Sequence, residues 1–125
     1  MAETTTDIAN KLLGHMKNMT EAQGLAELYH PEATSVEAMP NPETGQREIK
    51  GLDAIKAKHE WWAQTMEMID GTIDGPYPHG EDRFAFFFKM KGKDKASGNI
   101  MDMEEVGVYH VADGKIVREE FFYSI

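Results

Sequence analysis

The chain has 125 residues and a formal net charge of −9, from 22 Asp and Glu against 13 Lys and Arg. This length predicts a single domain over residues 1–125 with a substantial core. A surface this acidic repels phosphate groups and anionic lipids, so we expect neither a nucleic-acid nor a membrane partner. The absence of cysteine excludes disulfides and thiolate metal sites and fits a cytoplasmic location.

Three helices are predicted in the first half of the chain. Apolar residues recur at helical spacing over 4–19 and over 20–29, where the proline after His30 ends the pattern. A third helix is predicted over 52–68. The stripe of this helix that would face the core contains Leu52, Ile55, His59 and Trp62.

Strands account for most of the remaining prediction. A strand over 33–39 is followed by a loop over 40–51 that is marked by two prolines and two glycines. After the third helix we predict four strands, at 68–77, 83–91, 100–111 and 115–125. Helices gathered early and an antiparallel meander late indicate an α+β domain.

The last two strands are joined by Asp113-Gly114, a strong signal for a two-residue hairpin turn. Counting outward pairs Ala112 with Lys115 and predicts which side chains share the core face. That predicted inward set is Glu104, Val106, Val108, His110, Val117, Glu119, Phe121 and Tyr123. Several carboxylates would then lie on an otherwise apolar face.

Three segments of the sequence resemble one superfamily. "LAELYHPEATSVEAMP", "REIKGLDAIKAKHEWW" and "ADGKIVREEFFY" are similar to the nuclear transport factor 2-like superfamily, which includes ketosteroid isomerases and SnoaL-like cyclases. The resemblance implies a cone-shaped, curved antiparallel sheet wrapped around the helices. This is the cystatin-like α-β(2)-barrel-type architecture, with an internal pocket. The resemblance also implies a homodimer through the outer sheet face, where Tyr109 and Phe122 are expected among charged residues.

A comparison with ketosteroid isomerases, made without gaps, places Glu37 at the general-base position. The second acid of that family falls on Val106 and its oxyanion tyrosine near Leu13, and neither side chain donates a hydrogen bond. A supporting tyrosine falls on His59. The resemblance therefore implies a pocket that lacks the isomerase oxyanion hole. Its wall positions fall on Phe84, Phe86, Phe88, Glu104, Glu119 and Phe121.

The catalytic candidates are Glu37, His59 and Tyr123. Glu37 is either a proton-transfer base in an apolar pocket or a hydrated carboxylate at a strand end. His59 either relays a proton or is a core-edge histidine, and Tyr123 would orient the ligand or supply the complementary proton. The ligand-binding candidates, whose aromatic members could equally be core, are Trp62, Phe84, Phe86, Phe88, Glu104, Val106, Glu119 and Phe121.

These residues suggest a protein with a small-molecule pocket and no cofactor. No metal site is expected, because the sequence has no two-His helix motif and no clustered ligand motif. One hypothesis is a cofactor-independent isomerase, cyclase, or hydrolase- or hydratase-like enzyme. A second is a non-catalytic dimeric domain that binds a small apolar ligand, and a third is an interaction module that uses only the sheet face.

Overall fold

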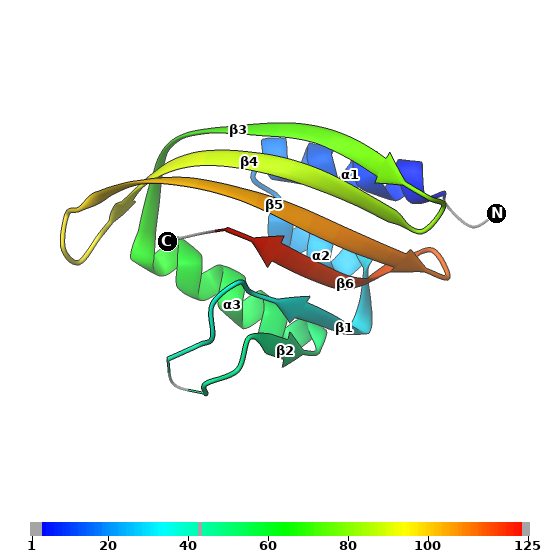
Figure 1. The fold of residues 1–125 in the computed structure, drawn as a ribbon, viewed down its shortest axis with the longest axis horizontal. Coiled ribbons are helices and arrows are strands. Elements are labelled where there is room, and N and C mark those ends of the chain that lie inside the picture. Colours follow the sequence, from blue (N-terminus) through cyan, green and yellow to red (C-terminus); the bar gives the residue numbers. More distant parts are fainter. Residues whose placement is uncertain (1–3, 43, 124–125) are drawn as a thin grey trace.

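The computed structural model describes residues 4–42 and 44–123, and Figure 1 shows three helices against one face of a curved sheet. Within these residues the elements are α1 (Thr5–Lys17), α2 (Glu21–Leu28), β1 (Tyr29–Val36), β2 (Glu48–Lys50), α3 (Leu52–Thr65), β3 (Met66–His79), β4 (Arg83–Asp94), β5 (Ile100–Ala112) and β6 (Lys115–Phe122). The α+β class and the three predicted helices are confirmed. The third helix ends three residues earlier than predicted.

Local sequence explains where α1 begins and which side it buries. The Thr4 hydroxyl accepts from the backbone N–H of Asp7 at 3.1 Å, and the Asp7 carboxylate accepts from the backbone N–H of Thr4 at 3.2 Å. This reciprocal capping box satisfies two N–H groups that the helix itself leaves unpaired. Ile8 and Leu12, one turn apart, are buried against the sheet.

The sheet has the strand order β2-β1-β6-β5-β4-β3. Every neighbouring pair is antiparallel except β1 and β6, which are parallel. Strand β2 lies inside the segment 40–51, which was predicted as loop, and β1 starts at Tyr29 rather than at residue 33. The predicted last strand extended to residues 124–125, which lie outside the described residues.

Aromatic side chains fill the concave face of the sheet under the helices. Phe84, Phe86 and Phe88 alternate along β4 and are all buried, as predicted. The ring of Tyr109 on β5 stacks on Phe84, with 5.1 Å between centroids and an angle of 9° between the planes. The ring of Phe121 meets Tyr109 edge-on at 6.2 Å. This concave face therefore carries the core.

The register of the β5–β6 hairpin differs from the prediction by one residue. The turn is as expected, because Asp113 and Gly114 both have positive φ and Ala112 pairs with Lys115. Beyond the turn the register shifts, and the next pairs are Val111 with Ile116 and His110 with Arg118. Residue 117 is thus the extra residue of a β-bulge.

The bulge changes which side chains of β5 face inward. Tyr109 is now opposite Glu119, and Gly107 is opposite Phe121. The inward prediction is right for Glu119, Phe121 and Tyr123. It is wrong for four residues, because the bulge turns the alternate set of β5 toward the core. Those on the outer face are Glu104, Val106, Val108 and His110. For the same reason Tyr109, which was expected on the outer face, is buried in the core.

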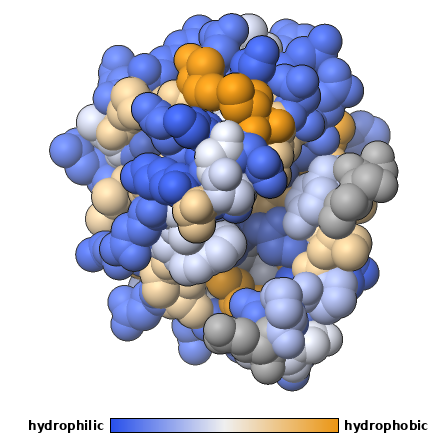
Figure 2. All heavy atoms as spheres, turned by 90° about the vertical axis from the view of Figure 1, so that its left-hand side faces the viewer, coloured by the Kyte–Doolittle hydropathy of each residue, from blue (hydrophilic) through white to orange (hydrophobic). Residues whose placement is uncertain are grey.

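The concave face continues beyond the helices as an arm formed by β3, β4 and β5 (Figure 1). Met90 and Met103 are cross-strand neighbours there, and Met68 and Met101 flank Gly92 in the next row. Met68 is 43% exposed and Met101 is 41% exposed. Figure 2 shows this end of the molecule, where an apolar strip interrupts a mostly hydrophilic surface.

Candidate functional site

A carboxylate is buried where β6 passes beneath the helices. Glu119 has no exposed surface, and its partner on β5 is Tyr109. The Tyr29 hydroxyl donates to Oε1 of Glu119, and the Ser35 hydroxyl donates to Oε2 at 2.7 Å. Burial, followed by the charge of Glu119, raises the pKa of Tyr29 well above its usual value. These contacts satisfy a charge that would otherwise be costly in the core.

Lys58 brings a positive charge to this carboxylate. It lies on α3 three residues after the buried Ile55, so the two side chains share a helix face. Its Nζ is 2.6 Å from the Ser35 hydroxyl, 3.6 Å from Oε2 of Glu119 and 5.0 Å from the centroid of the Phe121 ring. The ammonium thus combines an ion pair with a cation–π contact.

Glu37 lies directly after β1, between the ammonium and the solvent. Its Oε1 accepts from Lys58 Nζ at 2.7 Å, and its Oε2 accepts from the Tyr123 hydroxyl at 3.1 Å. The backbone is fixed from both sides by Arg47, because the Glu37 N–H donates to the Arg47 carbonyl and Arg47 Nε donates to the Glu37 carbonyl. The Glu37 side chain is 31% exposed, so a ligand can reach it.

Two further titratable groups lie close enough to feel these charges. Glu105 is on the inner face of β5, opposite Phe88. Burial, reinforced by the charges of Glu37 and Glu119 and opposed by Lys58, raises the pKa of Glu105 to about 7. Burial also lowers the pKa of His59, on α3, below its usual value. The pKa of Tyr123 is raised to about 12 by burial and then by Glu37.

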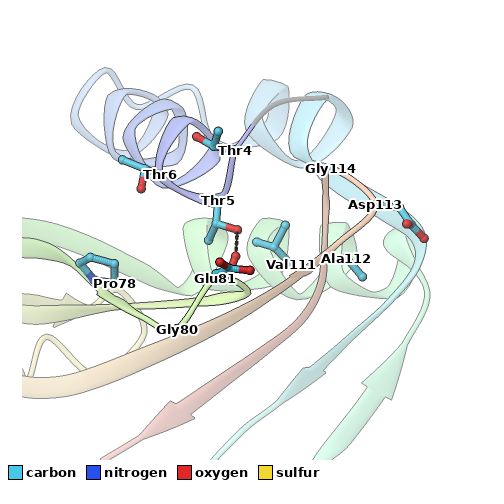
Figure 3. A pocket seen from close by; sticks show the side chains of 10 residues that line it. All are labelled: Thr4, Thr5, Thr6, Pro78, Gly80, Glu81, Val111, Ala112, Asp113 and Gly114. Atoms are coloured by element: carbon cyan, nitrogen blue, oxygen red, sulfur yellow. Dashed lines mark hydrogen bonds between the residues drawn. The ribbon is translucent and has the colours of Figure 1, made fainter. Parts of the chain in front are cut away.

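Two hollows lined by described residues lie outside the cluster around Lys58. The first measures about 530 Å³ and is bordered by the start of α1 and by the β3–β4 and β5–β6 turns. Figure 3 shows the Thr5 hydroxyl, which donates a hydrogen bond to the Glu81 backbone carbonyl across this hollow. The second measures about 540 Å³ and lies beside Val36, Arg47 and Arg118. Neither is lined by Glu37. Neither hollow is therefore the internal pocket that the resemblance implies around Glu37. The side chains of Glu37 and Lys58 are partly exposed, so the cluster can be reached from the solvent.

Two classes of site are not found in the described residues. Over residues 4–42 and 44–123, no three His, Asp or Glu side chains are placed to hold a metal ion. Over the same residues, no helix is both long and apolar enough to span a bilayer.

The comparisons with known proteins agree with this fold. The profile of the SnoaL-like domain matches residues 3–123. A crystal structure from Mesorhizobium loti, provisionally described as a SnoaL-like polyketide cyclase, is 34% identical with a TM-score of 0.88, and the match covers 97% of this chain and 100% of that one. The chain belongs to the SnoaL-like family.

More distant members of the fold share the architecture of this SnoaL-like chain. An NTF2-like protein from Burkholderia thailandensis has 18% identity, a TM-score of 0.81 and coverage of 98% and 92% of the two chains. A protein with a ketosteroid isomerase-like fold from Catenulispora acidiphila, solved with trimethylamine, has 16% identity, a TM-score of 0.72 and coverage of 98% and 88%. Among curated proteins, none matches significantly.

The SnoaL-like fold brings together some of the residues predicted for the site and separates others. Glu37, Tyr123, Glu119 and Phe121 lie around Lys58, and His59 is its neighbour on α3. Trp62 is half-buried one turn further along the helix, and the three phenylalanines of β4 form the adjacent core. Two predicted ligand-binding residues, Glu104 and Val106, lie on the opposite side of the sheet because of the bulge. The Glu104 side chain is 66% exposed.

Four residues of the cluster were missed in the sequence. Glu105 was passed over because the hairpin count placed Glu104 inward instead. Lys58 follows Ile55 at helical spacing, a signal that could have placed it inward, but lysine is usually exposed. Ser35 and Tyr29 lie two and eight residues before Glu37 on the first strand. A strict period of two predicts Ser35 on the same face as Glu37.

Proposed function

We propose that this protein binds a small, partly apolar molecule beside Glu37 and catalyses a proton transfer on it. The reaction class is that of a cofactor-independent isomerase, cyclase or hydratase-like enzyme. The observation that carries the proposal is a pair of carboxyl groups with different surroundings on one concave face. Glu37 is paired with Lys58 and partly exposed, whereas burial raises the pKa of Glu105 to about 7. Such differences divide the roles of base and acid between two carboxyls.

In this proposal Glu37 accepts the proton from the ligand. Glu105 supplies the complementary proton near neutral pH, because both of its protonation states are then populated. Tyr123, which donates to Glu37, keeps that carboxylate oriented, and His59 contributes a neutral imidazole close by. The apolar part of the ligand would lie along the concave face toward Met90 and Met103, since methionine adapts to irregular shapes.

The descriptions of two similar proteins support a small organic ligand. The M. loti protein is provisionally described as a polyketide cyclase, and the C. acidiphila protein holds trimethylamine. The first description implies a small organic substrate, and trimethylamine is itself a small organic molecule.

The experiment that tests the proposal is deuterium exchange into a panel of small ketones and enones in D2O. Loss of the NMR signals of hydrogens next to the carbonyl reports proton abstraction directly. We expect exchange with the native protein and with Glu60→Gln, which changes an exposed carboxylate on α3. Exchange should fall by roughly 10²-fold or more in Glu37→Gln, the usual contribution of a general base. Equal exchange in both variants would contradict the role of Glu37.

The alternative is a non-catalytic dimeric domain that binds a small apolar ligand. The observation in its favour is that Lys58 already neutralises Glu37 within the protein. This alternative predicts that panel compounds raise the melting temperature without any exchange. The proposed homodimer would form through the outer sheet face, where Phe122 is 49% exposed near Val106 and Val108. Light scattering should then give twice the 14.1 kDa chain mass, and Phe122→Lys should halve it.

The absence of cysteine supports the cytoplasm as the proposed compartment.

A further inference from the structure

We propose that the Lys58 ammonium binds the oxygen of a carbonyl substrate and holds the negative charge that develops there. The ligand class is then a neutral ketone, ester or enone with an ionisable hydrogen on the carbon next to the carbonyl. This inference rests on the proposed function and names both the substrate class and the group that stabilises the intermediate.

The hydrogen bonds of Lys58 leave room for such an oxygen. An ammonium has three N–H donors. With the described residues, Lys58 Nζ makes two hydrogen bonds, to the Ser35 hydroxyl at 2.6 Å and to Glu37 Oε1 at 2.7 Å. The nearest Glu119 oxygen is 3.6 Å away, beyond a good hydrogen bond. The Lys58 side chain is 24% exposed, so the third donor can meet a ligand from the solvent side.

The position of Glu37 couples oxygen binding to proton abstraction. In a carbonyl compound, the oxygen and the neighbouring carbon are separated by only two bonds. A ligand oxygen that contacts Nζ therefore presents the hydrogen of that carbon to the adjacent Glu37 carboxylate. Because Lys58 Nζ and Glu37 Oε1 are only 2.7 Å apart, one ligand can place its carbonyl oxygen at the ammonium and its neighbouring C–H at the carboxylate.

The proposed step is balanced with these two side chains alone. The C–H bond breaks, its proton forms an O–H bond on Glu37, and its electron pair becomes a carbon–carbon double bond. The carbonyl π pair moves onto the oxygen, which becomes an enolate bound to the Lys58 ammonium. Protonation of the enolate at another carbon, by Glu37 or by Glu105, gives an isomer. Attack of the enolate carbon on a second carbonyl of the same molecule gives a ring, and the alkoxide that forms takes a proton from Glu37 or Glu105.

The charges around Lys58 favour a neutral substrate. A ligand anion would meet the carboxylates of Glu37 and Glu119, with Glu105 on the same face. A ligand cation would meet the ammonium itself. A neutral carbonyl avoids both costs, and charge appears on its oxygen only as the Glu37 charge is removed by the transferred proton.

Lys58 also fills a role for which the isomerase comparison left no donor. Leu13 packs against the core and Val106 lies on the outer face, so neither could serve. The ammonium on α3 supplies the missing donor from a different element.

The test uses 4-nitrophenol, whose anion resembles an enolate and absorbs at a different wavelength from the neutral phenol. Nitrobenzene, which has no hydroxyl, serves as the neutral comparator. All proteins carry Glu37→Gln, which reproduces the charge of the site after proton transfer. Onto this background we place Lys58→Gln or, as the matched control, Lys56→Gln, an exposed lysine of the same helix.

We expect Lys58→Gln to weaken binding of the nitrophenolate by at least roughly tenfold relative to Lys56→Gln, because hydrogen bonds to charged groups are the stronger ones. Nitrobenzene should bind both proteins equally. Equal nitrophenolate binding by the two proteins, with nitrobenzene still bound, would refute the role of Lys58 and leave the binding site intact. If neither compound binds the background protein, the proposed function fails, and this inference with it.

A second measurement needs no Lys58 variant. In the background protein labelled with ¹⁵N, the Lys58 Nζ signal should move when nitrophenolate is added and stay in place with nitrobenzene. A signal that does not move with nitrophenolate bound would overturn the proposal. So would an imine that borohydride fixes between Lys58 and a ketone, since the nitrogen would then act as a nucleophile and not as an ammonium.

Discussion

Replacing Glu105 with glutamine should stabilise the protein above neutral pH. The pKa of this carboxyl is about 7 in the folded chain against 4.5 for an unperturbed glutamate, chiefly because of burial. The folded state thus binds the Glu105 proton more tightly than the unfolded state does. The bound proton therefore stabilises the folded state fully below about pH 4.5, and this stabilisation is lost as the pH rises to about 7.

The size of the effect follows from the two pKa values. A shift of one unit corresponds to about 1.4 kcal/mol, so an ionised Glu105 costs the fold about 3 kcal/mol. Glutamine has nearly the shape of the protonated acid and does not ionise. We therefore expect the free energy of unfolding of Glu105→Gln to exceed that of the native protein by about 3 kcal/mol at pH 8. For a domain of this size, this corresponds to a melting temperature about 10 °C higher. At pH 5 the two should differ far less.

Urea denaturation at several pH values from 5 to 8 measures this difference. Glu104→Gln is the matched control, because that carboxylate is the next residue along β5, points to the outer face and is 66% exposed. The control should follow the native protein at every pH. If Glu105→Gln loses stability with rising pH as steeply as the native protein, the carboxyl is not buried as the register requires.

Three further predictions concern the surroundings of the site. Glu119→Gln should destabilise the fold by about 3 kcal/mol in urea denaturation, because one amide oxygen replaces two carboxylate oxygens that accept from hydroxyls; an unchanged midpoint would contradict this. The His59 ring should titrate by NMR below 6.5, and its contribution to stability should be lost as the pH falls below that value; a midpoint above 6.5 would contradict its burial. Gly107→Ala should cost about 1–3 kcal/mol, because its Cβ would lie 3.1 Å from three aromatic rings, whereas Gly14→Ala, in open space on α1, should stabilise by up to about 1 kcal/mol. Equal melting temperatures for these two glycine variants would refute the packing described around Gly107.

The helices and the hairpin turn were predictable because their signals are local. A capping residue, a period of 3.6 and an Asp-Gly pair act over a few positions, and each was found near its predicted place. The alternation of Phe84, Phe86 and Phe88 likewise identified the buried face of β4. Glu37 and Tyr123 were predicted together, and the structure joins them by a hydrogen bond of 3.1 Å.

Which side chains of β5 face the cluster depends on the β-bulge, and no local sequence signal marks that bulge. Glu104 and Glu105 are the same residue type side by side, so composition alone does not decide which of them faces inward. The bulge on β6 decides it, and nothing in the residues around Val117 distinguishes a bulged strand from a regular one. Lys58 was missed for another reason, since its burial depends on carboxylates that are distant in the sequence.

Because the side chains of β6 alternate, the bulge sets which residues of that strand reach the inner face. Ile116 and Glu119 are three residues apart, yet their partners on β5, Val111 and Tyr109, are only two apart. The strand thus takes up one residue without moving the pairs on either side of it. A deletion of Val117 should therefore close the bulge and leave Glu119 opposite Tyr109, so that this position tolerates a change in chain length that would alter the site if the strand were regular.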